Sequence, residues 1–263
     1  MKGKKMKKLI GLVVALMPMG LVAAPLPAVA ILGAVSTPAW NSEVQAKLVG
    51  TGRFSSVAVV DVVSTTPTLA TLQQYRALLV YPDANYSDPN ALGDVLADYI
   101  DGGGAVVEAV FGNYVYMGGR YASGNYSTFD VIQNCGRSSG PLTLGTIRLP
   151  ASSLVAGVTT FNGGSSSYNA CVNGLAAGAV DVADWSDGSP LIAYKLKNGH
   201  PIVALGFYPP SRDSRSDFWD PTTDGAKIMA NALLFTVSAP TNVPAPPPLE
   251  ITPLAPMTLS VVP

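Results

Sequence analysis

A strand–helix–strand pattern at residues 76–112 is the clearest arrangement of hydrophobic and polar positions in the chain. It begins with the short apolar run Ala77–Tyr81, which is typical of a strand buried on both faces. Asp88-Pro89 then offers a helix N-cap followed by a proline in the first turn. The apolar residues that follow at helical spacing are Leu92, Val95, Leu96, Tyr99 and Ile100. Three glycines end this helix, and Ala105–Val110 predicts the next strand.

Two strands joined by a helix are parallel, so this pattern predicts an α/β sheet. The preceding residues repeat the alternation, with candidate strands at Ile31–Val35 and Val57–Val60. One helical face between these strands is formed by Trp40, Val44 and Leu48. A short helix is expected around Thr68–Gln74. The fold class predicted is α/β with a doubly wound, mostly parallel sheet, whose ligand crevice lies at the carboxyl ends of the strands.

The last part of the domain shows hairpin signals. The turn sequences Asp187-Gly188 and Asn198-Gly199 separate three apolar runs, which are Val180–Trp185, Pro190–Lys195 and Pro201–Gly206. A closing helix is expected over residues 224–235, with its apolar positions facing the sheet.

Two segments differ from this pattern. Residues 113–178 are rich in Gly, Ser, Asn and Tyr, and they predict an irregular, partly β insertion over the carboxyl edge of the sheet. Residues 238–263 are rich in proline and almost uncharged, which predicts an extended or disordered tail. The folded domain is therefore expected to span residues 31–237.

The amino terminus predicts export. Lysines precede the apolar stretch Leu9–Ala24, and Ala28-Val29-Ala30 is a small-x-small cleavage sequence. We expect residues 1–30 to be a cleaved bacterial-type signal peptide, with an uncleaved anchor as the alternative. The mature chain would then be secreted, periplasmic or attached to the cell surface, without stable membrane insertion. However, Ala28–Val35 also resembles the first strand of the sheet, so the cleavage position stays open.

The net charge of the chain argues against a nucleic-acid partner. The chain has 16 basic and 17 acidic residues, and residues 1–30 contain five lysines and no acid, so the remainder carries a net charge of −6. Nucleic-acid binding calls for a clustered basic surface, and this balance argues against it.

The two cysteines are Cys135 and Cys171. In an exported chain, such a pair is more typical of a disulfide than of a redox or metal site. Two free buried cysteines are the alternative.

Three motifs together resemble the class I glutamine amidotransferase-like superfamily, in particular its exported, non-catalytic and ThuA-like branches. They are the strand–helix–strand unit of residues 78–112, the sequence GGRYASGNYSTF at Gly118–Phe129, and the ending GHPIVALGFYPPSRDSRSDFWDPTTDGAKIMANALLF at Gly199–Phe235. The resemblance implies a flavodoxin-like three-layer sandwich. Catalytic members of the superfamily carry a cysteine at a strand-to-helix elbow and a His-Glu pair later in the chain.

This sequence departs from the catalytic pattern. The matching elbow is Val110-Phe111-Gly112-Asn113, which has neither a thiol nor a hydroxyl. The single histidine, His200, lies beside a predicted turn and is followed by proline. Because a nucleophile needs an adjacent base, we expect no glutaminase chemistry and assign no catalytic residue.

Candidate ligand-binding residues cluster in the loops expected at the carboxyl edge, and these are Asp83, Tyr86, Asn113, Tyr114, Arg120 and Tyr121. Aromatic rings with amides suit sugar or peptide recognition, because a ring offers an apolar face and its hydroxyl a hydrogen bond. The alternative is tyrosine packing within a loop-rich insertion. A second tyrosine set near this crevice is Tyr81, Tyr116 and Tyr126.

The carboxylates of this region can also be explained by structural roles. Glu108 lies within a strand expected to be covered on both faces, where it is a polar group of the crevice, a residue at an edge position or a structural partner of Arg120. Asp83 and Asp88 belong to an oxygen-rich loop that lacks the spacing of an EF-hand, and Asp88 is better explained as a helix cap. We predict no metal and no cofactor.

A charged loop precedes the closing helix and contains Arg212, Asp213, Arg215, Asp217, Trp219 and Asp220. We interpret it as a network that holds the loop in place.

Two functional hypotheses follow from these features. The first is an exported, non-enzymatic binding or scaffold domain of the cell envelope or extracellular space that recognises a glycan or a protein. The second is a carbohydrate-directed hydrolase that uses Glu108 or Asp83 with Arg120, which would require two carboxylates at a definite separation across a cleft.

Overall fold

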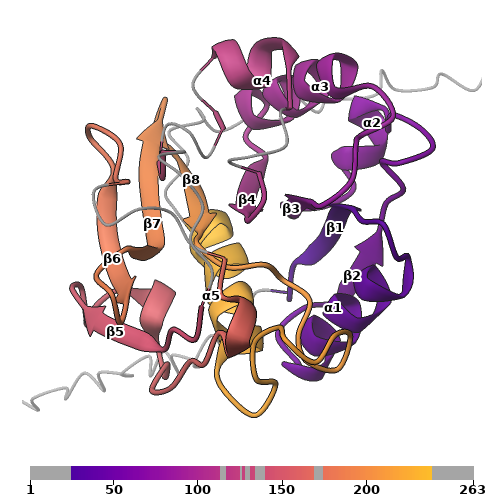
Figure 1. The fold of residues 1–263 in the computed structure, drawn as a ribbon. Helices are drawn as coiled ribbons and strands as arrows, with labels where there is room; N and C mark the ends of the chain where they lie inside the picture. Colours follow the sequence, from indigo (N-terminus) through magenta and orange to yellow (C-terminus); the bar gives the residue numbers. More distant parts are fainter. Residues whose placement is uncertain are drawn as a thin grey trace, which may run out of the picture.

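A computed structural model describes residues 25–112, 117–124, 126–127, 131–133, 140–168 and 174–238. The described residues form one eight-stranded sheet covered by helices on both faces (Figure 1). The strands lie in the order β2-β1-β3-β4-β8-β7-β6-β5. The predicted α/β class with a mostly parallel sheet is confirmed.

Five neighbouring strands of the sheet are parallel. They are β1 (Ala28–Ala34), β2 (Ser56–Val59), β3 (Ala77–Pro82), β4 (Ala105–Ala109) and β8 (His200–Leu205). Strands β1, β3 and β4 are buried along almost their whole length, which explains their continuous apolar sequences. The carboxyl ends of all five strands therefore lie at one edge of the sheet.

Three strands extend the sheet in antiparallel pairing, and they are β7 (Pro190–Lys197), β6 (Val180–Trp185) and β5 (Leu144–Ile147). The two-residue turn between β7 and β8 has positive φ at Asn198 (51°) and Gly199 (83°), as a hairpin with the right-handed twist requires. Both predicted hairpins are confirmed.

The helices are α1 (Ala39–Gly50), α2 (Leu69–Leu72), α3 (Pro89–Asp101), α4 (Gly119–Ser123) and α5 (Gly225–Ser238), with short 3-10 turns η2 (Ser153–Val155) and η3 (Gly164–Ser166). Helix α3 begins as predicted, because Asp88 Oδ1 accepts hydrogen bonds from the amides of Asn90 and Ala91, both at 3.0 Å.

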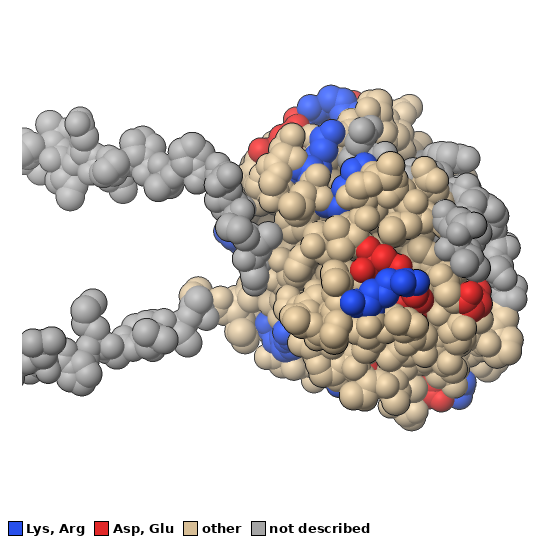
Figure 2. All heavy atoms as spheres, turned by 90° about the vertical axis from the view of Figure 1, so that its left-hand side faces the viewer, with Lys and Arg blue, Asp and Glu red and all other residues tan. Residues whose placement is uncertain are grey.

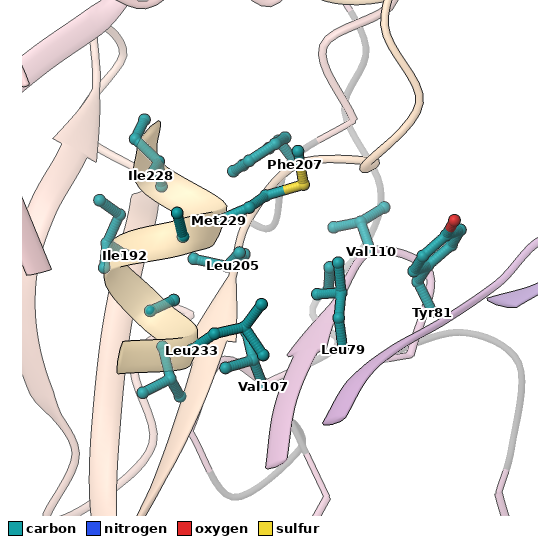
Figure 3. Packing of buried hydrophobic residues seen from close by; sticks show 14 of the residues in the cluster. Leu79, Tyr81, Val107, Val110, Ile192, Leu205, Phe207, Ile228, Met229 and Leu233 are labelled. Atoms are coloured by element: carbon teal, nitrogen blue, oxygen red, sulfur yellow. The ribbon is translucent and has the colours of Figure 1, made fainter. Parts of the chain in front are cut away.

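Two hydrophobic clusters form the core, one on each face of the sheet. The first contains the inner side chains of α1 and α5, and Figure 3 shows Ile228, Met229 and Leu233 of α5 directed at strand residues such as Leu79 and Val107. The second lies under α2, α3 and α4. The three layers match the sandwich that the family resemblance implies.

The described parts of the insertion predicted at residues 113–178 pack against α3 and extend the sheet. Helix α4 packs closely on α3, because a side chain at Gly93 would approach Gly118 O to 2.0 Å. Further along the chain, β5 adds the outermost strand beside β6. Described parts of this segment therefore extend the sheet and cover one face, and residues near Tyr168 reach the carboxyl edge.

Candidate functional site

Four residues that lie within three positions of the ends of parallel strands gather at the carboxyl edge. Ser36 follows β1, Asp83 follows β3, Phe111 follows β4 and Tyr208 follows β8. The strand order places β1, β3, β4 and β8 side by side, so these residues occupy adjacent positions along the edge. We name this group the edge site.

The carboxylate of Asp83 is fixed by Ser36. Its Oδ1 accepts a hydrogen bond from the Ser36 amide at 2.8 Å, and its Oδ2 accepts one from Ser36 Oγ at 2.9 Å. The backbone beneath is also held, because the amides of Asp83 and Ala84 both donate to Ala34 O at 2.8 and 3.0 Å. A partly exposed carboxylate with a fixed orientation is thus presented at this edge, with lone pairs left to accept further hydrogen bonds.

A buried hydrogen-bond chain supports the site from below. Tyr81 Oη donates to Asn41 Oδ1 at 2.6 Å, and Asn41 Nδ2 donates to Gly33 O at 2.8 Å. Burial raises the pKa of Tyr81 well above its usual value, and the charges of Glu43 and Asp83 raise it further. The phenol therefore stays neutral and fixes the end of β3 to the start of α1.

Tyr208 forms the centre of the edge site. Its ring contacts Tyr81, Phe111 and Phe218, with centroids 5.8, 5.3 and 5.3 Å away. Its hydroxyl is buried and has no hydrogen-bond partner among the described residues. Burial raises the pKa of Tyr208, and the negative charge of Asp83 is the next contribution. A buried donor without a partner costs about 1–3 kcal/mol, so this hydroxyl is available for a bound group.

Aromatic and charged residues from later in the chain form the other side of the site. The ring of Tyr168 lies 4.8 Å from that of Phe111, and the Arg215 guanidinium lies 4.1 Å from the centre of the Phe218 ring. Arg215 also pairs with Asp217, at 2.5 Å from Nε to Oδ1, which lowers the pKa of Asp217 to about 2. The site thus has an aromatic floor with an acid on one side and an ion pair on the other.

A small cavity of about 10 Å³ lies beneath Tyr168 and Tyr208, and it is lined also by Ser166, Ser167 and Phe207. Such a volume suits about one water molecule. It leaves the aromatic floor closely packed, so ligand contacts are expected above the rings.

The loop of residues 206–224 is held in place by side chains of other elements. Glu43 of α1 accepts hydrogen bonds from the Ser211 amide at 3.1 Å and from Ser211 Oγ at 2.7 Å. Trp219 Nε1 donates to Pro209 O at 2.9 Å, and Arg212 pairs with Asp220 at 3.3 Å. The interpretation of the charged loop as a structural network is confirmed.

Several predicted site residues lie elsewhere. Tyr86 and Tyr121 belong to the core cluster under α3 and α4, whereas Phe111 and Tyr208 of the edge site belong to the cluster on the other face of the sheet. Arg120 is half exposed on α4 and pairs there with Asp98 and Asp94. Of the predicted ligand-binding set, Asp83 is at the edge site, while Asn113 and Tyr114 lie outside the described residues.

Glu108 does not pair with Arg120, so that predicted alternative is wrong. Its carboxylate is 1% exposed and accepts a hydrogen bond from Tyr121 Oη at 3.1 Å. A side chain at Gly112 would lie 2.3 Å from Glu108 Oε1, so the glycine of the elbow leaves room for this acid. The physical reason is directional: Arg120 lies on the exposed side of α4, whereas Tyr121 points to the sheet.

Ser36, Asn41, Phe111, Tyr168 and Tyr208 were missed as candidates. For Ser36 a signal existed, because it directly follows Ile31–Val35, a predicted strand of the parallel sheet. Tyr208 follows Pro201–Gly206, which was predicted only as a hairpin strand. Tyr168 had no signal, since its approach to Phe111 depends on the path of an irregular segment.

Two features are absent from the described residues. These residues contain no group of three or more His, Cys, Asp or Glu side chains placed to hold a metal ion. None of their helices combines the length and apolar character that a membrane span requires. Cys135 and Cys171, predicted to form a disulfide, lie outside the described residues.

Solved structures with the same architecture are ThuA-like proteins. One from Parabacteroides merdae aligns with a TM-score of 0.59 at 14% sequence identity, covering 85% of this chain and 94% of its own. Another from Bacteroides uniformis gives 0.56 at 14% identity, covering 84% and 96%. This chain has the ThuA-like fold.

A glutamine amidotransferase from Thermotoga maritima aligns less closely, with a TM-score of 0.45 at 11% identity over 80% of this chain and 95% of its own. No family model and no curated protein matches the sequence. The expected ThuA-like fold is confirmed by the two ThuA-like structures.

Proposed function

We propose that this chain is an exported, non-enzymatic ThuA-like domain that binds a carbohydrate at the edge site. The observation that carries the proposal is the buried Tyr208 hydroxyl, which has no hydrogen-bond partner among the described residues and lies close enough to the fixed Asp83 carboxylate for that charge to raise its pKa. A sugar hydroxyl can satisfy both groups at once, because it accepts from the phenol and donates to the carboxylate.

The aromatic floor supports the same ligand class. The Phe111 ring contacts both the Tyr168 and the Tyr208 rings at the edge. Aromatic rings offer apolar faces to the C–H face of a sugar ring, while the adjacent polar groups fix its orientation. Figure 2 shows a different side of the molecule, the one on which β5 and β6 lie in Figure 1, with small groups of acidic and basic residues among uncharged ones.

Catalysis has little support at this site. The elbow after β4 has Val110, Phe111 and Gly112 where an activated nucleophile would be required, and sequence places Asn113 next. Glu108, the acid that a hydrolase would use, is enclosed against Tyr121, whereas Asp83 is held by Ser36. The proposal therefore assigns recognition without turnover.

Binding to an oligosaccharide array, followed by calorimetric titration, tests this function. The probes are chitin oligosaccharides, β-glucan oligosaccharides and peptidoglycan fragments, applied to the chain without its first 24 residues. Tyr208→Phe is expected to weaken binding by about tenfold, because one hydrogen bond to the ligand is lost. Its folding stability should not fall, since the hydroxyl makes no internal hydrogen bond among the described residues.

Tyr99→Phe is the matched control, because Tyr99 Oη donates to Tyr75 O at 3.0 Å, away from the edge site. This variant should lose some stability and keep its affinity. Absence of binding to every probe, or equal affinity of Tyr208→Phe and the unmodified chain, would reject the proposed site.

Export requires a cleavage position that leaves the sheet intact. Strand β1 begins at Ala28, which is in register with Ser56 of β2, and Ala28 O also accepts from the Arg76 amide at 2.8 Å. Cleavage after Ala30 would remove three residues of this central strand. We therefore propose cleavage upstream of Ala28, and we expect mass spectrometry of the secreted protein to show an amino terminus at or before that residue; a terminus at Ile31 would contradict this.

A further inference from the structure

The pairing of β6 with its neighbours contains an irregularity that brings two acids together. Asp181 and Asp184 are three residues apart, so a regular strand would direct them to opposite faces of the sheet. The register of β6 against β7 shifts between Asp181 and Ala183 and again between Ala183 and Asp184. Both carboxylates consequently reach the same guanidinium, that of Arg148 at the end of β5.

Arg148 binds one oxygen of each acid. Its Nε lies 2.8 Å from Asp181 Oδ2, and its Nη2 lies 2.8 Å from Asp184 Oδ2. The other oxygen of each acid, Oδ1, is buried and has no hydrogen-bond partner among the described residues. The Asp184 side chain is 2% exposed and that of Asp181 18%, so water is a poor substitute for the missing donors.

The charge balance of this cluster calls for one proton. Two ionised acids beside one arginine would carry a net charge of −1 in a largely buried place, where charge is costly. A proton held between two carboxyl oxygens removes this charge and supplies the missing hydrogen bond. The β7 residues opposite the two acids are the uncharged Ala193 and Pro190, and the charged residues of β7, Lys195 and Lys197, lie further along the strand.

We propose that Asp181 and Asp184 share one proton between their Oδ1 atoms, and that loss of this proton loosens the attachment of β5 to β6. Consistent with this geometry, the pKa of Asp181 is raised to about 6, first by burial and then by its hydrogen bond and charge interaction with Asp184, against the opposing effect of Arg148. An acid with a raised pKa contributes stability that is complete below about pH 4 and is lost as the pH rises through about 6.

The attachment of β5 to β6 is local, and its stability can be measured. The amides of Arg148 and Leu149 both donate to Val182 O, at 2.9 and 3.2 Å, immediately beside the two acids. Repulsion between two ionised carboxylates would act on this end of the β5–β6 pairing. Loss of the shared proton therefore makes β5, the outer strand of the sheet, more labile above about pH 6.

The direct test is a carbon-13 NMR titration of the aspartate carboxyl groups in the unmodified full chain. A shared proton predicts that the Asp181 signal titrates near pH 6 and that the Asp184 signal responds to the same step, because the proton belongs to the pair. Independent titration of both groups below about pH 4.5 would overturn the proposal. This measurement needs no variant and so does not depend on the folding of one.

Hydrogen exchange of the Arg148 and Leu149 amides tests the structural consequence. After correction for the intrinsic effect of pH, their exchange should accelerate about fivefold between about pH 5 and about pH 7.5. In Asp181→Asn, whose amide group can donate permanently to Asp184, the acceleration should disappear. Asp213→Asn is the control, because Asp213 is exposed and pairs with Lys47 on another part of the molecule; an acceleration retained in Asp181→Asn would contradict the role of the pair.

Discussion

Trp185→Ala is expected to lower the free energy of unfolding by about 3–5 kcal/mol, as large-to-small substitutions of buried aromatic residues do. Trp185 is 1% exposed at the end of β6. Its indole packs on Phe161, with ring centroids 5.2 Å apart, and its Nε1 donates to Gly206 O at 2.9 Å. The substitution therefore leaves a cavity and an unpaired carbonyl where the insertion, β6 and the segment after β8 meet.

Chemical denaturation followed by circular dichroism measures this loss. Leu196→Ala is the control, because Leu196 is a large apolar side chain with 59% exposure on the neighbouring strand, and it should change stability by less than about 0.5 kcal/mol. A loss below about 1 kcal/mol for Trp185→Ala would show that this part of the core is packed differently.

Gly33→Ala is expected to cost about 2–4 kcal/mol through overpacking and a broken buried hydrogen bond. The added Cβ would lie 2.0 Å from Asn41 Oδ1 and 2.9 Å from Tyr81 Cζ. Both atoms belong to the hydrogen-bonded pair that connects α1 to β3 below the edge site. The substitution must displace Asn41, which leaves the buried Tyr81 hydroxyl without its acceptor.

Gly50→Ala separates this effect from the general consequence of adding a methyl group. Gly50 is the last residue of α1, and its added Cβ would meet nothing within 4 Å. Alanine there should leave stability unchanged or raise it by up to about 1 kcal/mol. Thermal unfolding of both variants gives the comparison, and equal midpoints would contradict the packing described at Gly33.

The local elements could be predicted well because their signals are contained within short segments. Asp88-Pro89 marked the start of α3, and Asn198-Gly199 marked a turn that requires two positive φ angles. The parallel order of the first strands followed from the helical crossovers. Strand β5 could not be anticipated in its position, since its pairing with β6 depends on how an irregular segment returns to the sheet.

The candidate site was predictable only in part. The rule that ligands meet the carboxyl ends of parallel strands directed attention to Asp83, which the structure places at this edge. It did not reveal that Tyr121 faces the sheet while Arg120 faces solvent, because a five-residue helix is too short to show a clear apolar stripe. Tyr208, Phe111 and Tyr168 come from three distant segments, and their contact is a product of the tertiary fold.

The most direct test of recognition without turnover is an NMR titration of the labelled chain with the tightest-binding saccharide of the array. We expect the shifts to concentrate at Ser36, Asp83, Phe111 and Tyr208, and the signals of the saccharide to show no conversion over time. Shifts concentrated away from the carboxyl edge, or steady consumption of the saccharide, would contradict the account.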